Sequence, residues 1–117
     1  MAIVGVGVDI VDLARFERAL DRTPRLRDRL FTTDEASLPL RSLASRFAAK
    51  EALLKALGDT VGARWHDMRI VSDAEGNPDL VVTGRVADIV AARGIASLHV
   101  SLSHDAGVAI AFVVAES

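Results

Sequence analysis

The sequence contains no cysteine, no tyrosine and only one tryptophan among its 117 residues. Without cysteine the chain can form neither a disulfide nor a thiolate metal site, so a reducing compartment is permitted. The lack of aromatic residues argues against a stacking platform for single-stranded nucleic acid. No basic flank precedes the first apolar residues, and no apolar run is long enough to span a bilayer. These absences predict a soluble, cytoplasmic protein with no membrane segment.

Neither sign of charge dominates the chain, which has 14 lysines and arginines against 16 aspartates and glutamates. The net charge of −2 argues against a protein that binds nucleic acid through its phosphates. Half of the residues are hydrophobic, as in ordinary globular proteins, and this length suffices for one domain with a real core. No repeat, linker or low-complexity segment divides the chain. The sequence therefore predicts a single domain over residues 1–117.

The most informative stretch is residues 46–58 (RFAAKEALLKALG), which are mostly strong helix formers. Ser42 or Ser45 can cap the start of this helix, and Gly58 supplies a left-handed stop. Apolar residues lie on nearly every side of the helical wheel, which is typical of a buried helix. A carboxylate in such a helix must be paired, hydrogen-bonded or bound to a metal, because an isolated buried charge is very costly.

Two carboxylates lie inside apolar segments. Asp9 lies near the end of residues 3–11, a β-branched run that predicts a buried strand, and Asp12 fills the role of a helix cap better. Glu51 lies in the buried helix, where the simplest interpretation is a pair with Lys55 worth only about 0.2–0.5 kcal/mol. If strand and helix pack together, the two acids meet, and oxygen ligands of this kind suit a hard cation such as Mg²⁺. Basic residues around Glu51 add the positive charge that phosphoryl transfer requires.

Arginines recur along the segment after Asp12, where residues 13–20 predict an amphipathic helix with Leu13, Phe16 and Leu20 facing inward. The outward arginines of this segment are Arg15, Arg18 and Arg22, and Arg25 and Arg29 continue the row. Such a row is either a solvated face or a docking surface. Its density on a slightly acidic chain favours an acidic partner.

The second half of the chain is rich in strand signals. The expected elements are hairpin strands at 68–72 and 80–82, a short helix at 85–93, and strands at 98–103 and 108–114 joined by a turn at 104–107. Thr32 or Thr33 with Glu35 signals another helix start ahead of the central helix. Together these elements predict one α+β domain with antiparallel strands.

Three segments resemble, in order and spacing, the motifs of holo-acyl-carrier-protein synthase, the short bacterial class of 4′-phosphopantetheinyl transferases. They are residues 6–11 (VGVDIV), 46–58 (RFAAKEALLKALG) and 101–105 (SLSHD). Weaker family positions match at Phe31, Thr32, Glu35 and residues 65–67, so the resemblance covers essentially the whole chain. The chain departs from the family after the helix: the family commonly continues as Gly-Thr-Gly, whereas Asp59 follows Gly58 here. An acid close to substrate phosphates is unfavourable, so the resemblance does not define the path of residues 59–62.

The resemblance implies an antiparallel sheet packed against a long central helix, and it implies the chemistry. Coenzyme A donates its 4′-phosphopantetheine group to a serine of apo acyl carrier protein, in support of fatty acid biosynthesis, and adenosine 3′,5′-bisphosphate leaves. Asp9 and Glu51 are then expected to hold Mg²⁺, which binds the pyrophosphate oxygens of coenzyme A, and Lys55 to stabilise phosphate oxygens. The expected coenzyme A contacts are Arg46, Lys50, Lys55, Gly58, Ser103 and His104. The expected carrier surface is Arg15, Arg18, Arg22 and Arg25.

The family's small members are trimers with active sites between subunits, so the resemblance also implies a homotrimer. The strand at 108–114 is apolar on both faces, which is consistent with burial against another subunit. The turn carrying Ser103 and His104 would complete a neighbour's site, although His104 as an ordinary hairpin histidine is nearly as plausible. The base that accepts the serine proton is open, with a metal-bound water and Asp105 as candidates.

Two other classes of function remain compatible with the residues themselves. A metal-dependent nucleotide hydrolase could use the same two acids, but it would need no basic surface for a carrier. A non-catalytic interaction domain would keep Glu51 and Lys55 as a structural pair. Magnesium-dependent binding of coenzyme A separates this last interpretation from the transferase.

Overall fold

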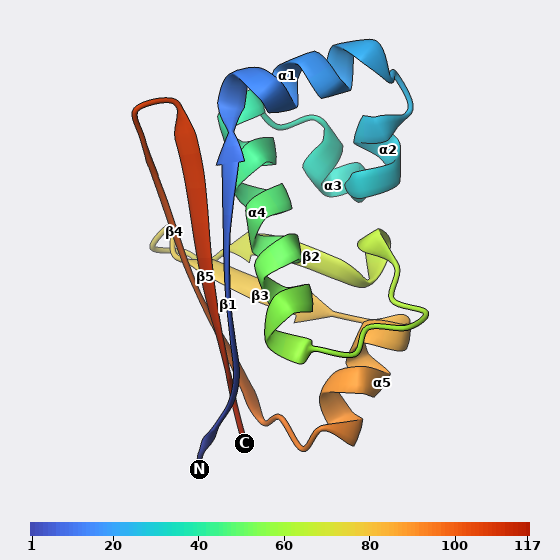
Figure 1. Cartoon of the computed structure of the whole chain (residues 1–117), viewed down its shortest axis with the longest axis vertical. Coiled ribbons are helices and arrows are strands. Elements are labelled where there is room, and N and C mark those ends of the chain that lie inside the picture. The colour runs from blue at the N-terminus through green and yellow to red at the C-terminus, as the bar shows by residue number, and fades with distance from the viewer.

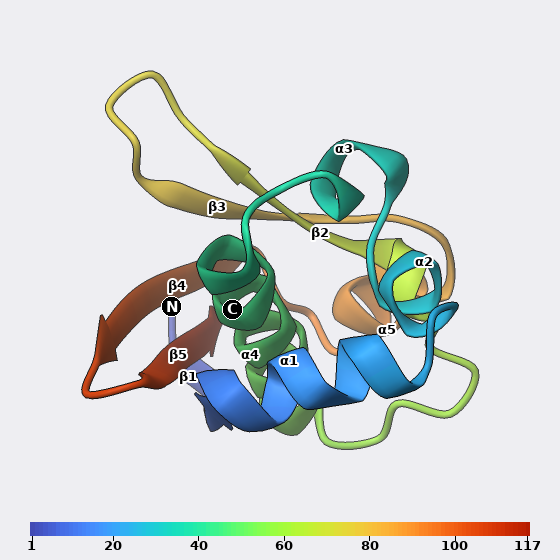
Figure 2. The same cartoon turned by 90° about the horizontal axis from the view of Figure 1, so that it is seen from above.

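The strands of the protein form two antiparallel sheets that lie on opposite sides of one long helix, α4 (Figures 1 and 2). The computed structural model describes all residues 1–117. In chain order the elements are β1 (Ile3–Asp12), α1 (Leu13–Arg22), α2 (Leu26–Leu30), α3 (Thr33–Ala36), α4 (Leu40–Leu57), the 3₁₀ turn η1 (Trp65–Asp67), β2 (Met68–Ser72), β3 (Pro78–Val82), α5 (Gly84–Ala92), β4 (Ser97–Asp105) and β5 (Val108–Glu116). The predicted α+β architecture with a sheet packed on a central helix is confirmed.

The larger sheet has the strand order β1-β5-β4, so the first and fourth strands are its two edges. Small residues of β5 face α4: Ala109, Ala111 and Ala115 are buried, as is Val113 between them. In the register of the β1–β5 pair, Asp9 lies opposite Ala111. Because side chains alternate along a strand, Asp9 therefore lies on the helix-facing side of the sheet.

Two glycines of β1 let α4 approach the sheet closely. A Cβ at Gly5 would overlap the carbonyl oxygen of Ala56, and a Cβ at Gly7 would overlap that of Ala52. Glycines inside a strand indicate the close approach of a backbone or a ligand, and here the neighbour is the helix backbone. This contact brings the end of β1 against the part of α4 that carries Glu51.

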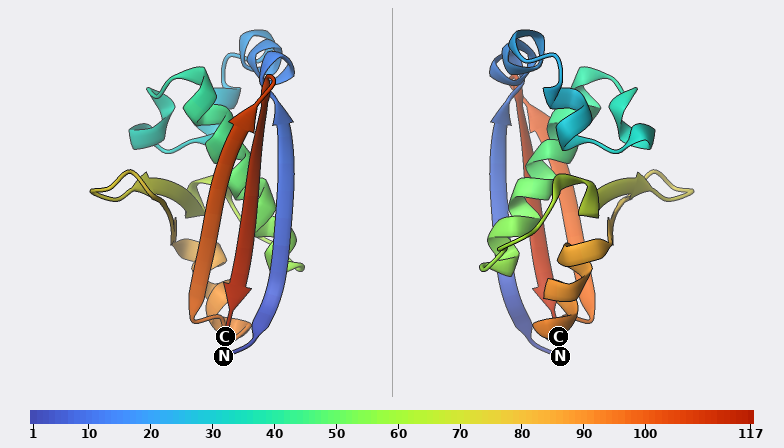
Figure 3. Two further views of the ribbon diagram at one scale, coloured as in Figure 1. Left: turned by 90° about the vertical axis from the view of Figure 1, so that its left-hand side faces the viewer. Right: turned by 90° about the vertical axis from the view of Figure 1, so that its right-hand side faces the viewer.

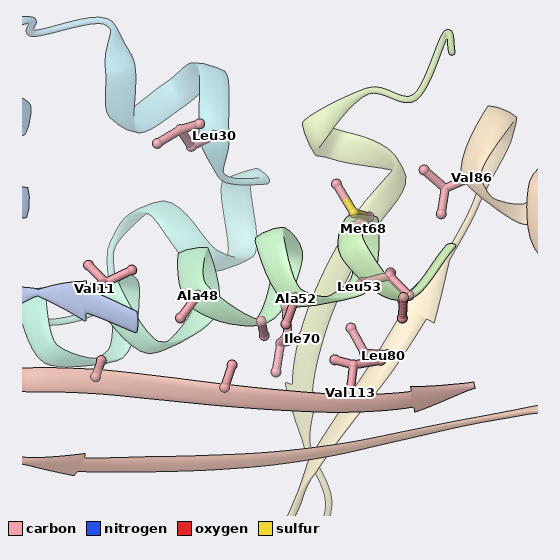
Figure 4. Close-up of a cluster of buried hydrophobic side chains, with 14 of the residues drawn as sticks. Val11, Leu30, Ala48, Ala52, Leu53, Met68, Ile70, Leu80, Val86 and Val113 are labelled. Carbon is pink, nitrogen blue, oxygen red and sulfur yellow. The ribbon is translucent and has the colours of Figure 1, made fainter. Parts of the chain in front are cut away.

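The core gathers around α4, as predicted for a helix that is apolar nearly all round (Figure 4). Leu43, Leu53 and Leu57 are completely buried. Burial of each such side chain contributes about 1.5–3 kcal/mol relative to exposure. The core also takes in Met68 and Ile70 of β2 and Val86 of α5, so both sheets and the last helix share it.

The start of α4 differs from the prediction. The helix begins at Leu40 with Pro39 in the capping position, and the Leu43 amide donates to the Pro39 carbonyl at 3.0 Å. Ser42 and Ser45 therefore lie inside the helix and cap nothing. Pro39 has a φ of −60° and an extended ψ of 156°, and no side chain caps this end of the helix. The predicted stop is confirmed, since Gly58 has a φ of +80° and follows the last helical residue.

No other element covers the outer face of the larger sheet (Figure 3, left), and the side chains on this face are largely apolar. Five large side chains there are between 38% and 65% exposed: Val6, Val8, Ile10, Ile110 and Phe112. The register pairs them across the sheet, with Val8 opposite Phe112 and Ile10 opposite Ile110. The strand predicted to be apolar on both faces thus covers α4 with one face and presents the other to the outside.

The short helix α2 and the turn η1 were not predicted, and the other elements differ from the expectations only at their ends. The turn of the last hairpin is Ala106 and Gly107, both with positive φ, so His104 and Asp105 belong to β4 and not to the turn. The hairpin strand expected at 80–82 begins earlier, at Pro78. Asp12 caps α1 as expected, because its carboxylate accepts from the Arg15 amide at 2.8 Å. None of the helices is long and apolar enough to cross a membrane.

Candidate active site

Asp9 and Glu51, the two acids singled out in the sequence, line the same groove between β1, α1 and α4. The groove has a volume of about 400 Å³. Its other lining residues are Ile10, Val11, Asp12, Arg15, Phe16, Ala19 and Phe47. The site therefore combines two carboxylates with an apolar wall and one arginine at the rim.

Lys55 belongs to this group, but it pairs with Asp9 and not with Glu51. Its Nζ donates to Asp9 Oδ1 at 3.1 Å and to the Val8 carbonyl at 3.0 Å. The lysine side chain is 55% exposed and that of Asp9 is 17% exposed. The simple i,i+4 pair considered from the sequence is therefore not what satisfies Glu51.

The electrostatics of Glu51 reflect this missing partner. Burial raises the pKa of Glu51, the negative charge of Asp9 raises it further, and the positive charge of Lys55 opposes both. Two like charges in one groove thus oppose each other, and the single lysine compensates them only in part. A further cation between the carboxylates would relieve this repulsion.

The donor set fits a magnesium ion. Mg²⁺ prefers oxygen ligands and is commonly bound by one or two carboxylates, with water and substrate phosphates completing its shell. Asp9 and Glu51 supply two such oxygen donors at the groove. No group of three or more His, Asp or Glu side chains gathers anywhere in the chain, so these two acids would leave most ligand positions to water and substrate.

The apolar wall of the groove consists of residues that the sequence pattern assigns only to the hydrophobic core and not to a site. The rings of Phe16 and Phe47 stack with centroids 5.3 Å apart and planes inclined by 17°, and Trp65 lies behind Phe47 at 5.6 Å. The helical spacing of Phe16 predicts only that it faces inward. Nothing in the sequence marks it as a wall of the groove, because that follows from the packing of α1 across α4.

Lys50, expected to bind coenzyme A, is completely buried away from the groove. Its Nζ donates to Glu35 Oε1 at 2.7 Å and to the Leu30 carbonyl at 2.7 Å. Burial lowers the pKa of Lys50, while Glu35 opposes that shift. Glu35 also accepts from the Ile70 amide at 3.0 Å, so the pair joins α3, α4 and β2. A fully enclosed ammonium cannot reach a phosphate. The expectation that Lys50 binds coenzyme A is therefore wrong for this structure.

Two other expected contacts lie on α4 before and after the site residues: Arg46 inside the helix and Gly58 at its end. Arg46 is half-buried one turn before Lys50, and its Nε is buried without a hydrogen-bond partner. Gly58 is exposed at the end of α4, beyond Lys55. Gly58 is accessible to a ligand, whereas the unsatisfied Nε of Arg46 is buried.

Ser103 and His104 do not join the groove of their own chain. Both are exposed on β4, and β5 separates that strand from β1, which carries Asp9. The expectation that they complete a site is therefore compatible only with the site of another subunit. Asp105, a candidate base, is exposed at the same end of β4.

The arginine row forms one exposed surface on α1 and the turn after it. Arg15, Arg18, Arg22 and Arg25 are all exposed, and none makes an ion pair, whereas Phe16 and Leu20 are buried on the opposite side of the helix. Arg15 also lines the groove. The basic surface thus reaches the rim of the site.

Comparisons with known proteins agree with this geometry. The model of the 4′-phosphopantetheinyl transferase superfamily matches residues 5–113. The holo-[acyl-carrier-protein] synthase of Leifsonia xyli subsp. xyli is 64% identical over 114 residues, which cover 97% of each chain. The crystal structure of this synthase from Neisseria meningitidis matches with a TM-score of 0.88 at 33% identity, covering 98% of this chain and 99% of the other.

A third relative was solved with a ligand. The Helicobacter pylori holo-[acyl-carrier-protein] synthase, a complex with coenzyme A, matches with a TM-score of 0.83 at 32% identity and covers 95% of this chain and 99% of its own. The superfamily match extends over both site acids, Lys55 and the arginine-bearing helix α1. The chain belongs to the 4′-phosphopantetheinyl transferase superfamily and, within it, to the holo-[acyl-carrier-protein] synthases.

Proposed function

We propose that this protein transfers the 4′-phosphopantetheine group of coenzyme A to a serine hydroxyl of an apo acyl carrier protein. The observation that carries the proposal is the groove lined by Asp9 and Glu51, with Lys55 bonded to Asp9, in a chain of this family. The products are the holo carrier protein and adenosine 3′,5′-bisphosphate. The cellular role would be the supply of carrier proteins for fatty acid biosynthesis in the cytoplasm.

The chemistry is a displacement at the β-phosphorus of coenzyme A. The serine oxygen forms a bond to this phosphorus, the bond to the bridging oxygen of the pyrophosphate breaks, and the hydroxyl proton leaves. A magnesium ion held by Asp9 and Glu51 would neutralise charge on the pyrophosphate. Lys55 is half-exposed and bound only at the surface, so its ammonium can exchange Asp9 for a phosphate oxygen without a large loss of stability.

The walls of the groove give the remaining residues a role in positioning. Phe16 and Phe47 form a stacked apolar side on which the pantetheine arm can lie while its phosphate remains near the acids. Water excluded from this side strengthens the charge interactions within the groove. Arg15 stands at the rim, where an arriving carrier must place its serine.

The carrier would dock on the basic surface of α1. Carriers of this kind are small and acidic according to the family resemblance, and Arg15, Arg18, Arg22 and Arg25 present free guanidinium groups. Complementary charge of this kind acts mainly on the rate of encounter and on orientation. Because Arg15 belongs both to this surface and to the groove, docking there delivers the serine to the phosphate.

We also propose that the protein acts as a homotrimer, with the number three taken from the family resemblance. The support is the apolar outer face of β1 and β5, which a second copy would cover, and the placement of Ser103 and His104 at the edge opposite Asp9. A neighbour could then bring its β4 edge to this groove. Light scattering at working concentration tests the assembly: a trimer is expected, and a monomer that transfers at full rate would refute the shared site.

The reaction itself is tested by mass spectrometry of an apo carrier protein incubated with this protein, coenzyme A and Mg²⁺. The carrier should gain one phosphopantetheine on a serine, and addition of a chelator should prevent the gain. A serine-to-alanine carrier is the matched control and should stay unmodified. Release of adenosine nucleotide without any change in carrier mass would instead identify a hydrolase.

A further inference from the structure

A second cavity, of about 350 Å³, lies between α2 and the turn η1. Its lining consists of Arg29 of α2, Arg64 just before η1, and Trp65 and His66 of η1. It shares no lining residue with the groove that holds the two acids. Figure 1 shows η1, the yellow-green turn, below α2 on the side of the molecule away from the larger sheet. The cavity is therefore distinct from the groove in which transfer would occur.

The lining is basic, and its two guanidinium groups have no partner in the chain. Arg29 and Arg64 are exposed and make no ion pair. The arginine side chains that donate hydrogen bonds are those of Arg27, Arg69 and Arg85. No carboxylate is among the lining residues. Like charges thus line one cavity without compensation, and an anion bound there would relieve their repulsion.

Contacts within the chain hold the walls of the cavity in place. His66 Nε2 donates to the Asp28 carbonyl at 2.6 Å, which ties η1 to α2. Because a carbonyl oxygen can only accept, this bond places a proton on Nε2 and leaves Nδ1 without a partner. The Asp67 carboxylate accepts from the Arg64 amide at 3.3 Å, so this neighbouring acid is engaged within the turn itself. The cavity is therefore preformed, and a ligand need not order its walls first.

Trp65 lies between this cavity and the wall of the groove. Its ring centroid is 5.6 Å from that of Phe47, which lines the groove, and its carbonyl accepts from the buried Lys50 ammonium at 3.5 Å. The indole is thus supported from the core while it lines the second cavity. Trp65 is also the single tryptophan of the chain, so tryptophan fluorescence reports on this cavity alone.

The donors of the cavity match a phosphate group better than a carboxylate. A carboxylate has two oxygens, and the fork of one guanidinium satisfies both. A phosphate monoester presents three terminal oxygens and a charge of about −2 at neutral pH. The cavity offers two guanidinium groups and one imidazole for these oxygens. The flat indole beside them provides an apolar surface for the remainder of the same molecule.

We propose that the cavity between α2 and η1 is a second anion site, which binds the phosphate group of a small phosphate monoester through Arg29, Arg64 and His66. This site is separate from the groove of Asp9 and Glu51, and it does not depend on the proposed transferase function. Its ligand lies against Trp65, whose ring contacts the wall of the groove.

Tryptophan fluorescence of the intact protein tests the site, with inorganic phosphate and phenyl phosphate as probes at constant ionic strength. Both probes should change the emission of Trp65 saturably, whereas chloride should not. Arg29→Gln and Arg64→Gln should each weaken binding of both probes about tenfold or more, as expected for loss of a charge-assisted hydrogen bond. Arg41→Gln changes the net charge equally at an exposed position in the first turn of α4, so it is the matched control and should bind like wild type.

Two further measurements test the chemistry of the site. Arg64→Lys keeps the positive charge without the planar fork and should recover only part of the binding that Arg64→Gln loses. Melting curves establish that each variant is folded. Acetate and malonate at the same ionic strength compare carboxylates with phosphate, and tighter binding of either one than of phosphate would overturn the assignment to a phosphate monoester.

The separation from the groove is tested by repeating the phosphate titration with saturating dephospho-coenzyme A and Mg²⁺, since this compound carries no phosphate monoester. The response of Trp65 to phosphate should persist, because the two cavities share no lining residue. Loss of that response, no saturable response in the wild type, or an equal loss in Arg41→Gln would each refute the second site. None of these measurements involves a carrier, so a protein that binds phosphate here but modifies no carrier would refute only the proposed function.

Discussion

Two lysines of α4, Lys50 and Lys55, each pair with a carboxylate at a similar distance, yet their surroundings differ completely. The Lys50–Glu35 pair measures 2.7 Å, and its side chains are 0% and 2% exposed. The Lys55–Asp9 pair measures 3.1 Å, and its side chains are 55% and 17% exposed. The first pair cannot exchange either partner without leaving a buried charge, whereas the second can exchange a partner for substrate.

This difference separates structure from chemistry within one helix. The buried pair joins segments that are distant in sequence, and Glu35 is further held by the amides of Thr32 at 3.1 Å and Ile70 at 3.0 Å. Asp9 of the exposed pair lines a groove together with a second acid, Glu51, whose charge Lys55 compensates only in part. Substitutions in the two pairs should therefore affect different measurements.

The largest effect is expected at the groove acids. Asp9→Ala and Glu51→Ala should each reduce transfer by roughly a thousandfold or more, because several kcal/mol of charge neutralisation at the pyrophosphate would be lost. Thermal unfolding of both variants should stay at or above the wild-type temperature, since two like charges no longer share one groove. Carrier mass and melting curves provide the two measurements. Full activity in both variants would exclude the assigned metal role.

The next effect is on stability and belongs to the buried pair. Lys50→Ala should lower the free energy of unfolding by about 3–5 kcal/mol, because Glu35 would remain buried without its cation. Lys55→Ala is the matched control and should cost at most about 1 kcal/mol, since its pair is exposed, while slowing transfer. Urea titrations measure both. Equal decreases in the free energy of unfolding for Lys50→Ala and Lys55→Ala would contradict the assignment of one pair to structure and the other to the site.

A smaller effect, severalfold on the Michaelis constant for the carrier, is expected at the basic surface of α1. Arg18→Ala with Arg22→Ala should raise the Michaelis constant for the carrier and leave that for coenzyme A nearly unchanged. The effect on the carrier should be largest at low salt, because added salt screens exposed charges. Ser72→Glu with Ala74→Glu changes the net charge equally on a distant hairpin and is the matched control. Equal behaviour of the two double variants would mean that only net charge matters.

The smallest effect concerns pH. Because the pKa of Glu51 is raised, the folded protein binds more protons than the unfolded chain between the ordinary and the raised value. Stability should therefore fall as the pH rises through that interval, by less than about 1 kcal/mol for this partly exposed group. Glu51→Gln should remove this component in urea titrations at a series of pH values. At pH values above this interval, added Mg²⁺ should raise the melting temperature of the wild type and leave that of Glu51→Gln unchanged.

Much of the site was accessible from the sequence because its acids contradict their local pattern. A carboxylate in a β-branched strand and another in a helix apolar on nearly every side each demand a partner, which is why the residues alone single out Asp9 and Glu51. That the two acids meet depends on the packing of β1 against α4. The same reasoning misplaced Lys50. A lysine next to Glu51 in the chain points about 100° away on the helix, so adjacency in sequence put it on the wrong side.

The sequence by itself determined most of the elements, the central buried helix and the exposed arginine row, and it singled out the two acids, because each of these depends on local periodicity and residue type. Only the tertiary structure decided the partners: Lys55 with Asp9, Lys50 with Glu35, and the stacked rings beside the groove. These contacts join residues far apart in the chain. Their choice depends on how closely β1 can approach α4, which the two glycines of β1 allow.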